Sequence, residues 1–241
     1  MHRPLAIEDD EIHVWRAALD PAVDVAADMA RWLDAEERAR AARFHQDRDR
    51  RRFVIAHAVL RLLLGGYCRC DPGALRFGLS PRGKPFLREP TSDLRFNLSH
   101  SGELAIYGLT RGAEIGIDVE QHRTELAADR IADRHFAPAE VAALQNLPPH
   151  QQSEAFFRCW TRKEAFIKAR GEGLSLPLSR FVVSLAPETP DALLSIGGDA
   201  APAAAWALCG LPVLEGYTAA LAVKARGRRL TIRDWDYASP A

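Results

Sequence analysis

Apolar residues recur along the chain with two periods, and segments with the 3.6-residue period predict helices. In the stretch from Phe156 to Leu174, four apolar side chains fall on one side of a helix at 100° per residue: Phe156, Phe157, Trp160 and Ile167. Gly171 and Gly173 predict its end. Further helices are predicted at 24–33, at 34–44 behind an Asp34–Glu37 capping signature, from 47 to the pair Gly65-Gly66, at 130–135, and from Pro138 onward.

Segments that alternate between apolar and polar residues predict strands. Residues 94–99, 104–110 and 115–120 form a predicted three-stranded meander, because turn residues separate them. Residues 11–16 predict an edge strand. Beyond Gly173, a second sheet is predicted from the strands 181–183, 193–196, 205–209, 217–224 and 230–232.

Both halves of the chain run in the same order, from helices through a longer helix that ends in glycine to a set of strands. This order predicts an α+β fold of two similar α/β lobes, residues 1–111 and 112–241, each with an antiparallel-rich sheet and packed helices. With 241 residues, the chain is long enough to bury a substantial core.

The amino-acid composition limits which partners and which cellular location we expect for the protein. The 32 Lys and Arg residues balance the 32 Asp and Glu residues, so we expect neither nucleic acid nor membrane as a partner. The four cysteines lack zinc or disulfide spacing, the start lacks a signal-peptide pattern, and no apolar run approaches the roughly 20 residues of a membrane span. We therefore expect a cytoplasmic protein with reduced thiols.

Arginines crowd the N-terminal half. A local anion site is one interpretation of this cluster, and a solvated helix surface is the other. Its members are Arg38, Arg40, Arg43, Arg48, Arg50, Arg51, Arg52 and Arg61.

Two carboxylates fall on one face of the predicted strand 115–120. Asp118 and Glu120 are two residues apart, so they stand about 7 Å apart along the strand. A sparse set of oxygen ligands suits Mg²⁺ better than zinc. Taken alone, the pair equally describes a solvent-facing strand, and Gly116 leaves space on the same face for a ligand or for a neighbouring backbone.

Polar residues also occur at two other informative places. Glu164 lies on the apolar side of the long helix and Lys168 one turn later, a spacing that alone predicts a surface pair worth a few tenths of a kcal/mol.

Asn97, Ser99 and His100 end a predicted strand at a turn, where they could hold a phosphate. Ser99 is a poor candidate nucleophile, because the chain has no G-x-S-x-G elbow and a histidine cannot easily reach its neighbour's hydroxyl.

Taken together, these residues resemble the 4′-phosphopantetheinyl transferases. The resemblance rests on the runs Phe96–Ser101, Gly116–Glu120 and Trp160–Lys168, followed by Gly171 and Gly173. Arg51-Arg52-Phe53 and Gly83-Lys84-Pro85 are similar to N-terminal motifs of the long two-lobed type, which serves carrier proteins of nonribosomal peptide and polyketide synthases. The likeness extends from about Asp34 to Leu178.

The resemblance implies a specific reaction. The lobes would be related by a pseudo-twofold axis, with the site in a cleft between them. Coenzyme A would donate its phosphopantetheine arm to a serine of an acyl or peptidyl carrier protein, and adenosine 3′,5′-bisphosphate would leave. Mg²⁺ would bridge the pyrophosphate, and a monomer would suffice.

The resemblance also implies residue roles. Asp118, Glu120 and Glu164 would bind Mg²⁺, and Glu164 would accept the proton of the incoming serine unless it only holds the metal. Lys168 would stabilise or protonate the leaving phosphate. The residues expected to contact coenzyme A are Arg52, Arg82, Gly83, Lys84, Asn97, Ser99, His100, Lys163 and Lys168.

The expected carrier-protein surface is the arginine-rich N-terminal half or the region from Arg123 to His135, with Phe136 or Leu147 adding apolar contact. Two other functions use the same features. One is a Mg²⁺-dependent phosphodiesterase acting on the holo-carrier protein. The other is a non-catalytic carrier-binding module, which the intact pair of Glu164 and Lys168 disfavours.

Overall fold

The computed structural model describes residues 5–122, 128–173, 176–186 and 189–238. The chain forms two compact units, called unit 1 (residues 1–79, 85–112 and 229–241) and unit 2 (residues 80–84 and 113–228). The main division, at 112/113, lies one residue from the expected boundary. Two segments differ from the expected lobes, since residues 80–84 belong to unit 2 and residues 229–241 belong to unit 1.

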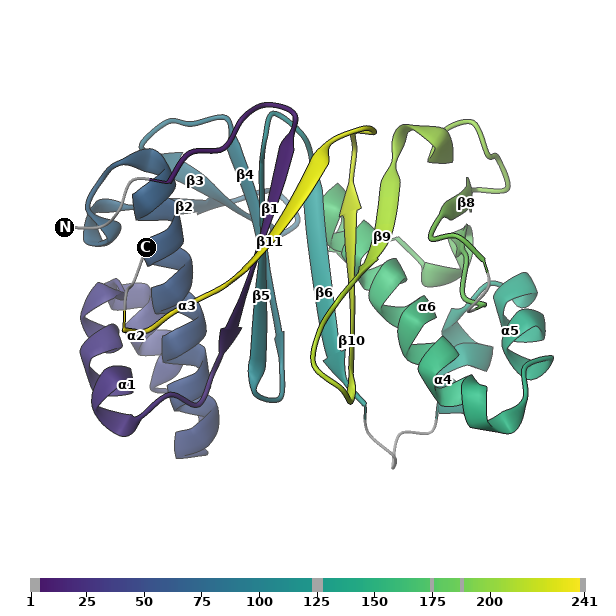
Figure 1. The fold of residues 1–241 in the computed structure, drawn as a ribbon, viewed down its shortest axis with the longest axis horizontal. Helices are drawn as coiled ribbons and strands as arrows, with labels where there is room; N and C mark the ends of the chain where they lie inside the picture. Colours follow the sequence, from purple (N-terminus) through teal and green to yellow (C-terminus); the bar gives the residue numbers. More distant parts are fainter. Residues whose placement is uncertain (1–4, 123–127, 174–175, 187–188, 239–241) are drawn as a thin grey trace. The chain divides into compact units, whose positions relative to one another are not determined.

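The described residues of unit 1 form a four-stranded sheet in the order β11-β1-β5-β4, a separate two-stranded sheet of β2 and β3, and three α-helices (Figure 1). The strands are β1 (Glu11–Ala18), β2 (Arg76–Leu79), β3 (Pro85–Glu89), β4 (Leu94–Ser101), β5 (Leu104–Arg111) and β11 (Arg229–Asp234). The helices are α1 (Val23–Met29), α2 (Ala35–Ala41) and α3 (Asp47–Cys68), with 3₁₀ turns η1 (Ala30–Trp32) and η2 (Pro72–Ala74).

The prediction of an edge strand near residue 11 is wrong. β1 lies inside the sheet, because β5 pairs with it antiparallel on one side and β11 pairs with it parallel on the other. Val14 is only 1% exposed and faces both Gly108 and Ile232 in the register. The partner that covers β1 comes from the far end of the chain, and no local pattern indicates it.

The start of α2 follows the prediction and the end of α3 does not. Asp34 Oδ1 accepts the Glu37 N–H at 2.9 Å and the Glu37 side chain accepts the Asp34 N–H at 3.1 Å, which confirms the capping box. Gly65 does not end α3, which continues to Cys68 and closes with Arg69 at φ 54°. A Cβ at Gly65 would lie 2.9 Å from Pro72 Cγ, so this glycine makes room for the following turn.

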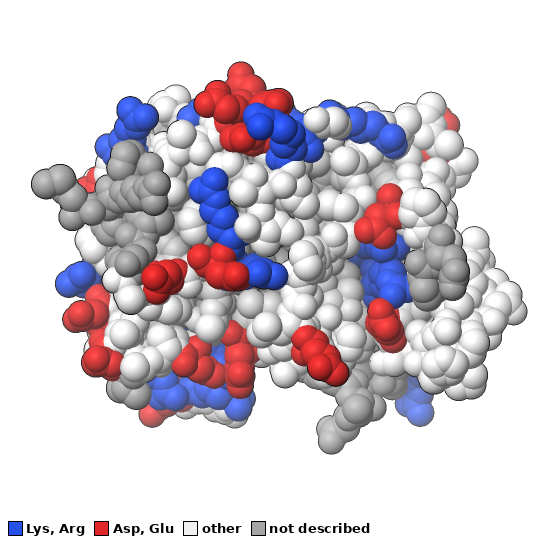
Figure 2. Space-filling model, viewed as in Figure 1, with Lys and Arg blue, Asp and Glu red and all other residues white. Residues whose placement is uncertain are grey.

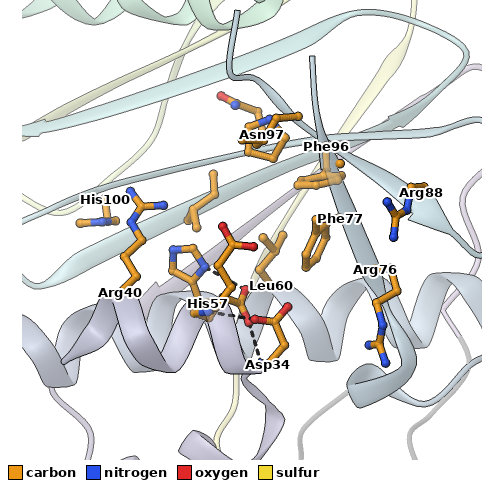
Figure 3. A pocket seen from close by; sticks show the side chains of 16 residues that line it. Asp34, Arg40, His57, Leu60, Arg76, Phe77, Arg88, Phe96, Asn97 and His100 are labelled. Atoms are coloured by element: carbon orange, nitrogen blue, oxygen red, sulfur yellow. Dashed lines mark hydrogen bonds and ion pairs between the residues drawn. The ribbon is translucent and has the colours of Figure 1, made fainter. Parts of the chain in front are cut away.

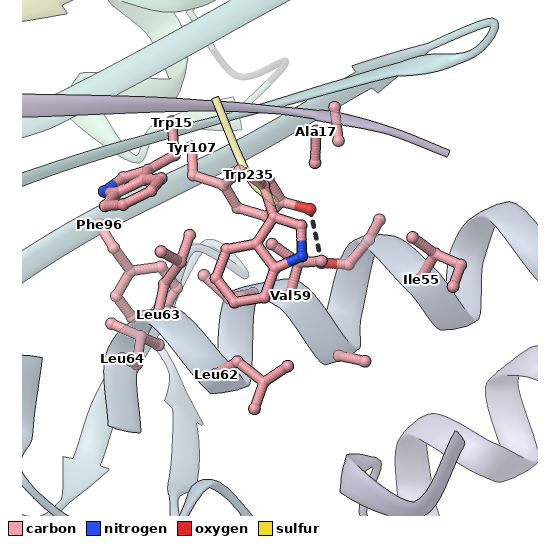
Figure 4. Packing of buried hydrophobic residues seen from close by; sticks show 14 of the residues in the cluster. Trp15, Ala17, Ile55, Val59, Leu62, Leu63, Leu64, Phe96, Tyr107 and Trp235 are labelled. Atoms are coloured by element: carbon pink, nitrogen blue, oxygen red, sulfur yellow. Dashed lines mark hydrogen bonds between the residues drawn. The ribbon is translucent and has the colours of Figure 1, made fainter. Parts of the chain in front are cut away.

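The core of unit 1 lies where α3 packs on the four-stranded sheet (Figure 4). Ile55 and Val59 of α3 are fully buried, and Trp235, just after β11, packs into the same cluster. The Tyr107 hydroxyl of β5 donates to the Ala56 carbonyl at 3.0 Å, which satisfies a fully buried phenol. The segment just after β11 is therefore part of the unit 1 core through Trp235.

A buried histidine lies on β1. His13 is 2% exposed; its Nδ1 lies 2.6 Å from the Tyr67 hydroxyl, which also accepts the Trp15 indole N–H at 2.9 Å. His13 Nε2 lies 3.3 Å from Glu11 Oε2. Burial lowers the pKa of His13, Arg233 lowers it further, and Glu11 opposes the shift.

We expect His13 to make the stability of the protein depend on pH. The unfolded histidine takes up a proton below about pH 6.5, whereas the buried neutral ring resists it, so the free energy of unfolding should fall by up to about 1.4 kcal/mol per pH unit below that point. His13→Gln should reduce this slope in urea denaturation at pH 7.5 and 5.5. His45→Gln, at an exposed histidine of unit 1, is the control; equal slopes for the two variants would contradict the assignment.

In unit 2, the part of the chain that the structure describes forms a three-stranded sheet in the order β6-β10-β9, a separate β7–β8 pair and three α-helices. The strands are β6 (Ile115–Gln121), β7 (Phe181–Val183), β8 (Leu193–Ile196), β9 (Ala207–Leu211) and β10 (Tyr217–Val223). The helices are α4 (Ala128–His135), α5 (Pro138–Gln145) and α6 (Pro149–Arg170), with 3₁₀ turns η4 (Leu178–Arg180) and η5 (Ala203–Ala205).

The predicted strand partners in this half require correction. β4 and β5 form the expected hairpin, but β6 does not continue it and pairs with β10 instead, Ile117 opposite Leu221. The second sheet was predicted to contain all five strands beyond Gly173. In the structure β11 lies in the sheet of unit 1, and β7 and β8 form a separate pair. Strand positions can be read from period 2, whereas the choice of partner depends on tertiary contacts.

The two units repeat one order of elements. β1, three helices and β2–β5 in unit 1 correspond to β6, three helices and β7–β10 in unit 2. In each unit the first strand pairs antiparallel with the last one of the set. The predicted α+β class and the shared order are confirmed, and the pseudo-twofold arrangement stays a prediction.

The helix α6 is the centre of unit 2 and packs on β6 and β10 (Figure 1). Phe156, Phe157 and Ile167 are buried as predicted, and Gly171 ends the helix at φ 64°. The opposite side is buried as well, since the Phe166 ring lies 4.7 Å from that of Phe181. The predicted stripe was therefore only part of the buried surface of this helix.

Candidate active site

Gly116 allows α6 to lie directly against β6. A Cβ at this position would lie 2.1 Å from the Ala165 carbonyl oxygen and 2.2 Å from the Ala169 backbone nitrogen. Of the two uses that the sequence allowed for this glycine, a ligand or a neighbouring backbone, the structure shows the backbone. The contact places the C-terminal half of α6 beside the carboxylates of β6.

Asp118 lies two residues beyond this contact. It is 3% exposed, and its Oδ1 lies 2.5 Å from Lys168 Nζ on α6, whose side chain is 30% exposed. A solvent-facing strand does not describe Asp118. Lys168 pairs with a buried carboxylate of another element, so a pair on the surface of its own helix does not describe it either.

Acidic neighbours surround this ion pair. Burial raises the pKa of Asp118 to about 7, Lys168 opposes the shift, and the charges of Glu120 and Glu164 add to it. Burial also raises the pKa of Glu164, with Lys168 lowering it and Glu120 raising it. Asp118 and Glu164 therefore share the Lys168 ammonium, Glu120 adds a third negative charge, and the group would be stabilised by a further cation.

The donor type fits Mg²⁺, but the ligands are not in a coordinating arrangement. Among the residues that the structure describes, no three His, Cys, Asp or Glu side chains are placed so that they could hold a metal ion. The Lys168 ammonium lies on Asp118 Oδ1. Carboxylate oxygens are nevertheless the ligands that Mg²⁺ prefers.

Lys163 was expected to contact coenzyme A, and the structure places it in the interior. Its side chain is 0% exposed, and Nζ donates to the carbonyls of Leu178 at 2.8 Å and Phe181 at 2.7 Å. Nζ also lies 2.7 Å from Glu140 Oε2. Because this ammonium is enclosed, we assign it to the folding of unit 2 and leave it out of the coenzyme A site.

The basic turn at 80–84 lies within unit 2. Arg82 is exposed, with Nη1 3.5 Å from Glu172 Oε2, and Gly83 closes the turn at φ 85°. Lys84 Nζ donates to Glu114 Oε2 at 3.1 Å. It also donates to two backbone carbonyls of unit 2, so Lys84 is not a loose surface cation.

Unit 1 contains a pocket of about 540 Å³ (Figure 3). Asn97 and His100 line it, and their expected phosphate contacts stay a prediction; Arg40 and His100 lie at one end in the view. Five further residues of its wall were not predicted as site residues: His57, Arg76, Phe77, Arg88 and Phe96. The arginine cluster indicated Arg40, whereas Arg76 and Arg88 lie on the strands of the β2–β3 hairpin, outside its Gly83-Lys84-Pro85 motif.

The acidic side of the pocket is held by a buried arginine. Arg61 is 0% exposed; its Nε donates to Glu37 Oε2 at 2.6 Å, and its guanidinium also pairs with Asp34. Glu37 Oε1 lies 3.2 Å from His57 Nδ1. This member of the arginine cluster therefore fixes two acidic side chains that line the pocket.

Two expected coenzyme A residues of unit 1 do not line the pocket. Ser99 is 6% exposed on β4. Arg52 donates through Nε to Asp20 at 3.0 Å, and its Nη2 lies 3.4 Å from Glu103 Oε1. The carboxylates near Arg52 are exposed, so they can exchange with another anion.

Comparison with known proteins places the chain in a family. Residues 17–109 match the family model described as 4′-phosphopantetheinyl transferase, N-terminal, and residues 114–222 match the 4′-phosphopantetheinyl transferase superfamily. The chain is 39% identical over 225 residues to the 4′-phosphopantetheinyl transferase HetI of Nostoc sp., covering 92% of each chain. The chain belongs to the 4′-phosphopantetheinyl transferase superfamily. It is an enzyme of this class.

Other relatives agree. The 4′-phosphopantetheinyl transferase Sfp of Bacillus subtilis is 33% identical over 154 residues, which is 64% of this chain and 67% of the relative. A solved apo-ACPS structure of Chronobacterium ammoiniagenes is 20% identical, with a TM-score of 0.34, and covers 47% of this chain and 98% of that one. That structural likeness is too weak to support any assignment.

Two expectations from composition can be compared with the structure. On the face shown in Figure 2, basic and acidic side chains lie next to each other, as equal numbers of the two would suggest. Within the described ranges, no helix is both long enough and apolar enough to span a bilayer.

The expected carrier-protein surface requires one correction and otherwise stays a prediction. Phe136 is 4% exposed and stacks on Phe156 at 5.4 Å, so its ring belongs to the core of unit 2 and cannot offer an apolar contact. Arg123 lies outside the described residues. Leu147, half-buried after α5, stays a prediction.

Proposed function

We propose that this protein transfers the 4′-phosphopantetheine arm of coenzyme A to a serine of an acyl or peptidyl carrier protein. The reaction depends on Mg²⁺ and releases adenosine 3′,5′-bisphosphate. The observation that carries the proposal is the buried Asp118–Lys168 pair beside Glu120 and Glu164, in a chain of this superfamily. We infer that carrier domains of nonribosomal peptide and polyketide synthases are the acceptors, and that the enzyme acts as a cytoplasmic monomer.

In this proposal, Asp118, Glu120 and Glu164 hold the Mg²⁺. When bound there, Mg²⁺ would neutralise the pyrophosphate charge and make the phosphorus easier to attack. These residues offer oxygen ligands from a strand and a helix that pack backbone to backbone at Gly116. The mutual repulsion of their charges favours binding of a divalent cation.

Glu164 and Lys168 divide the proton chemistry. Burial raises the pKa of Glu164, which makes its carboxylate a better acceptor for the proton of the carrier serine. Lys168 lies one turn later with a half-buried ammonium, a point charge suited to the leaving phosphate. Metal ligation would weaken Glu164 as a base, so its two proposed roles compete.

The pocket of unit 1 supplies the proposed phosphate contacts. Asn97, His100 and Arg40 line one wall and combine an amide, an imidazole and a guanidinium. Arg52 belongs to this set if a phosphate replaces Asp20 as its partner. The remaining proposed contacts are Ser99 in unit 1 and Arg82 and Gly83 in unit 2.

Identification of the small-molecule product tests this proposal against the phosphodiesterase alternative. Incubation with coenzyme A, Mg²⁺ and apo-carrier protein should release adenosine 3′,5′-bisphosphate in step with carrier modification, as seen by liquid chromatography. Incubation with holo-carrier protein should leave it intact. Release of free phosphopantetheine from the holo-carrier, without any bisphosphate in the first reaction, would favour the phosphodiesterase.

A further inference from the structure

We propose that Lys84 is a positioning residue that fastens the start of β6 to the end of α6 and so sets Asp118 against Lys168. It acts within unit 2, through backbone carbonyls, rather than by binding coenzyme A. The consequence for catalysis rests on the proposed function, whereas the link that Lys84 makes between β6 and α6 can be tested without it.

The Lys84 ammonium donates to at least three acceptors among the described residues. Nζ donates to Glu114 Oε2 at 3.1 Å, to the Ile115 carbonyl at 3.0 Å and to the Ala169 carbonyl at 2.8 Å. An ammonium has three N–H donors, so these contacts match its donor number. The side chain is 16% exposed, and a phosphate could bind this group only by displacing a carbonyl or Glu114.

One of these acceptors lies at the C-terminus of α6. The last carbonyls of a helix lack intrahelical partners and carry the negative end of the helix dipole, so a cation there is favourable. Lys84 binds the Ala169 carbonyl, one residue beyond Lys168. A Cβ at Gly171 would lie 3.0 Å from Lys84 Cδ, so this glycine also leaves room for the lysine stem.

The other backbone acceptor lies at the start of β6. Ile115 precedes Gly116, where α6 and β6 touch, and Asp118 follows three residues after Ile115. The Lys84 ammonium therefore binds the carbonyl just before the close contact on β6 and the carbonyl just after Lys168 on α6. These two bonds fix the position of one element along the other, and the 2.5 Å pair of Asp118 and Lys168 depends on that position.

The test is Lys84→Met, which keeps the length of the stem and removes all three donors. Hydrogen exchange followed by mass spectrometry should show at least fivefold faster exchange of amides in β6 and the last turn of α6. In carrier-modification assays, kcat should fall at least tenfold while KM for coenzyme A stays within twofold. Lys84→Arg, which keeps N–H donors, should restore part of the exchange protection.

The matched control is Lys224→Met, which removes an exposed cation from unit 2. It should leave exchange and kinetics as in the unchanged protein. A Lys84→Met variant with raised KM for coenzyme A, unchanged kcat and unchanged exchange would overturn the proposal and make Lys84 a coenzyme A contact. Failure of the unchanged protein to modify any carrier would refute the proposed function. The hydrogen-exchange result would still show whether Lys84 joins β6 to α6.

Discussion

Gly116→Ala is expected to destabilise unit 2 by about 3 kcal/mol or more and to abolish most of the activity. The added methyl would lie 2.1 Å from one backbone atom of α6 and 2.2 Å from another. Rotation of a side chain cannot relieve contacts with backbone, so α6 must move away from β6. This movement would also separate Asp118 from Lys168, and the loss of activity should therefore exceed the unfolded fraction.

Urea denaturation and carrier-modification kinetics on the same samples measure both effects. The control is Gly210→Ala on β9 of the same unit, where the nearest atom to the new methyl is Asp191 Oδ2 at 3.1 Å. That atom belongs to a partly exposed side chain and can shift, so we expect a much smaller change. If Gly116→Ala had the stability and activity of the unchanged protein, the close packing of β6 and α6 would not be needed.

Asp118→Asn is expected to lower kcat by about 10³-fold while the fold persists. The amide keeps the size of the side chain, but it removes the charge that pairs with Lys168 and that is proposed to bind Mg²⁺. The folded pKa of Asp118 lies near 7, above its ordinary value of 3.8. The stability linked to its protonated form is present below about pH 4 and is lost as pH rises through 7.

Since asparagine does not ionise, the variant should be at least as stable as the unchanged protein at pH 8 without metal. Thermal unfolding in the presence of a chelator checks the stability, and single-turnover kinetics check the chemistry. Glu215→Gln, at an exposed carboxylate in the turn before β10, is the control and should have no effect on either. Turnover near that of the unchanged protein in Asp118→Asn would remove Asp118 from the proposed metal site.

The sequence predicts features that depend on neighbouring residues. The Asp34 capping box, the end of α6 at Gly171 and the β4–β5 hairpin are confirmed, because each depends on a few adjacent side chains or one backbone conformation. The family could also be predicted, because its motifs lie in short runs around β4, β6 and α6.

Features that depend on distant partners could not be predicted. β1 is enclosed by a strand from the far end of the chain, and β6 pairs with β10 rather than β5. Periodicity shows which face of a strand is apolar, but not which strand will pair with it.

Adjacent charged residues on α6 show the same limit within the site. Lys163 and Glu164 are neighbours in the motif, yet Lys163 is enclosed with Glu140 while Glu164 is only partly buried near Asp118. Helical geometry turns consecutive side chains 100° apart, and the surrounding elements decide which of them reaches solvent. The partners of Lys84 could not be predicted either, because Ala169 lies 85 residues away along the chain.

The intact mass of an apo-carrier protein tests the central claim most directly. After incubation with this protein, coenzyme A and Mg²⁺, we expect the carrier to gain one phosphopantetheine group, and a carrier variant without the acceptor serine to gain none. Unchanged mass in every one of several acyl and peptidyl carrier proteins would contradict the proposed transfer.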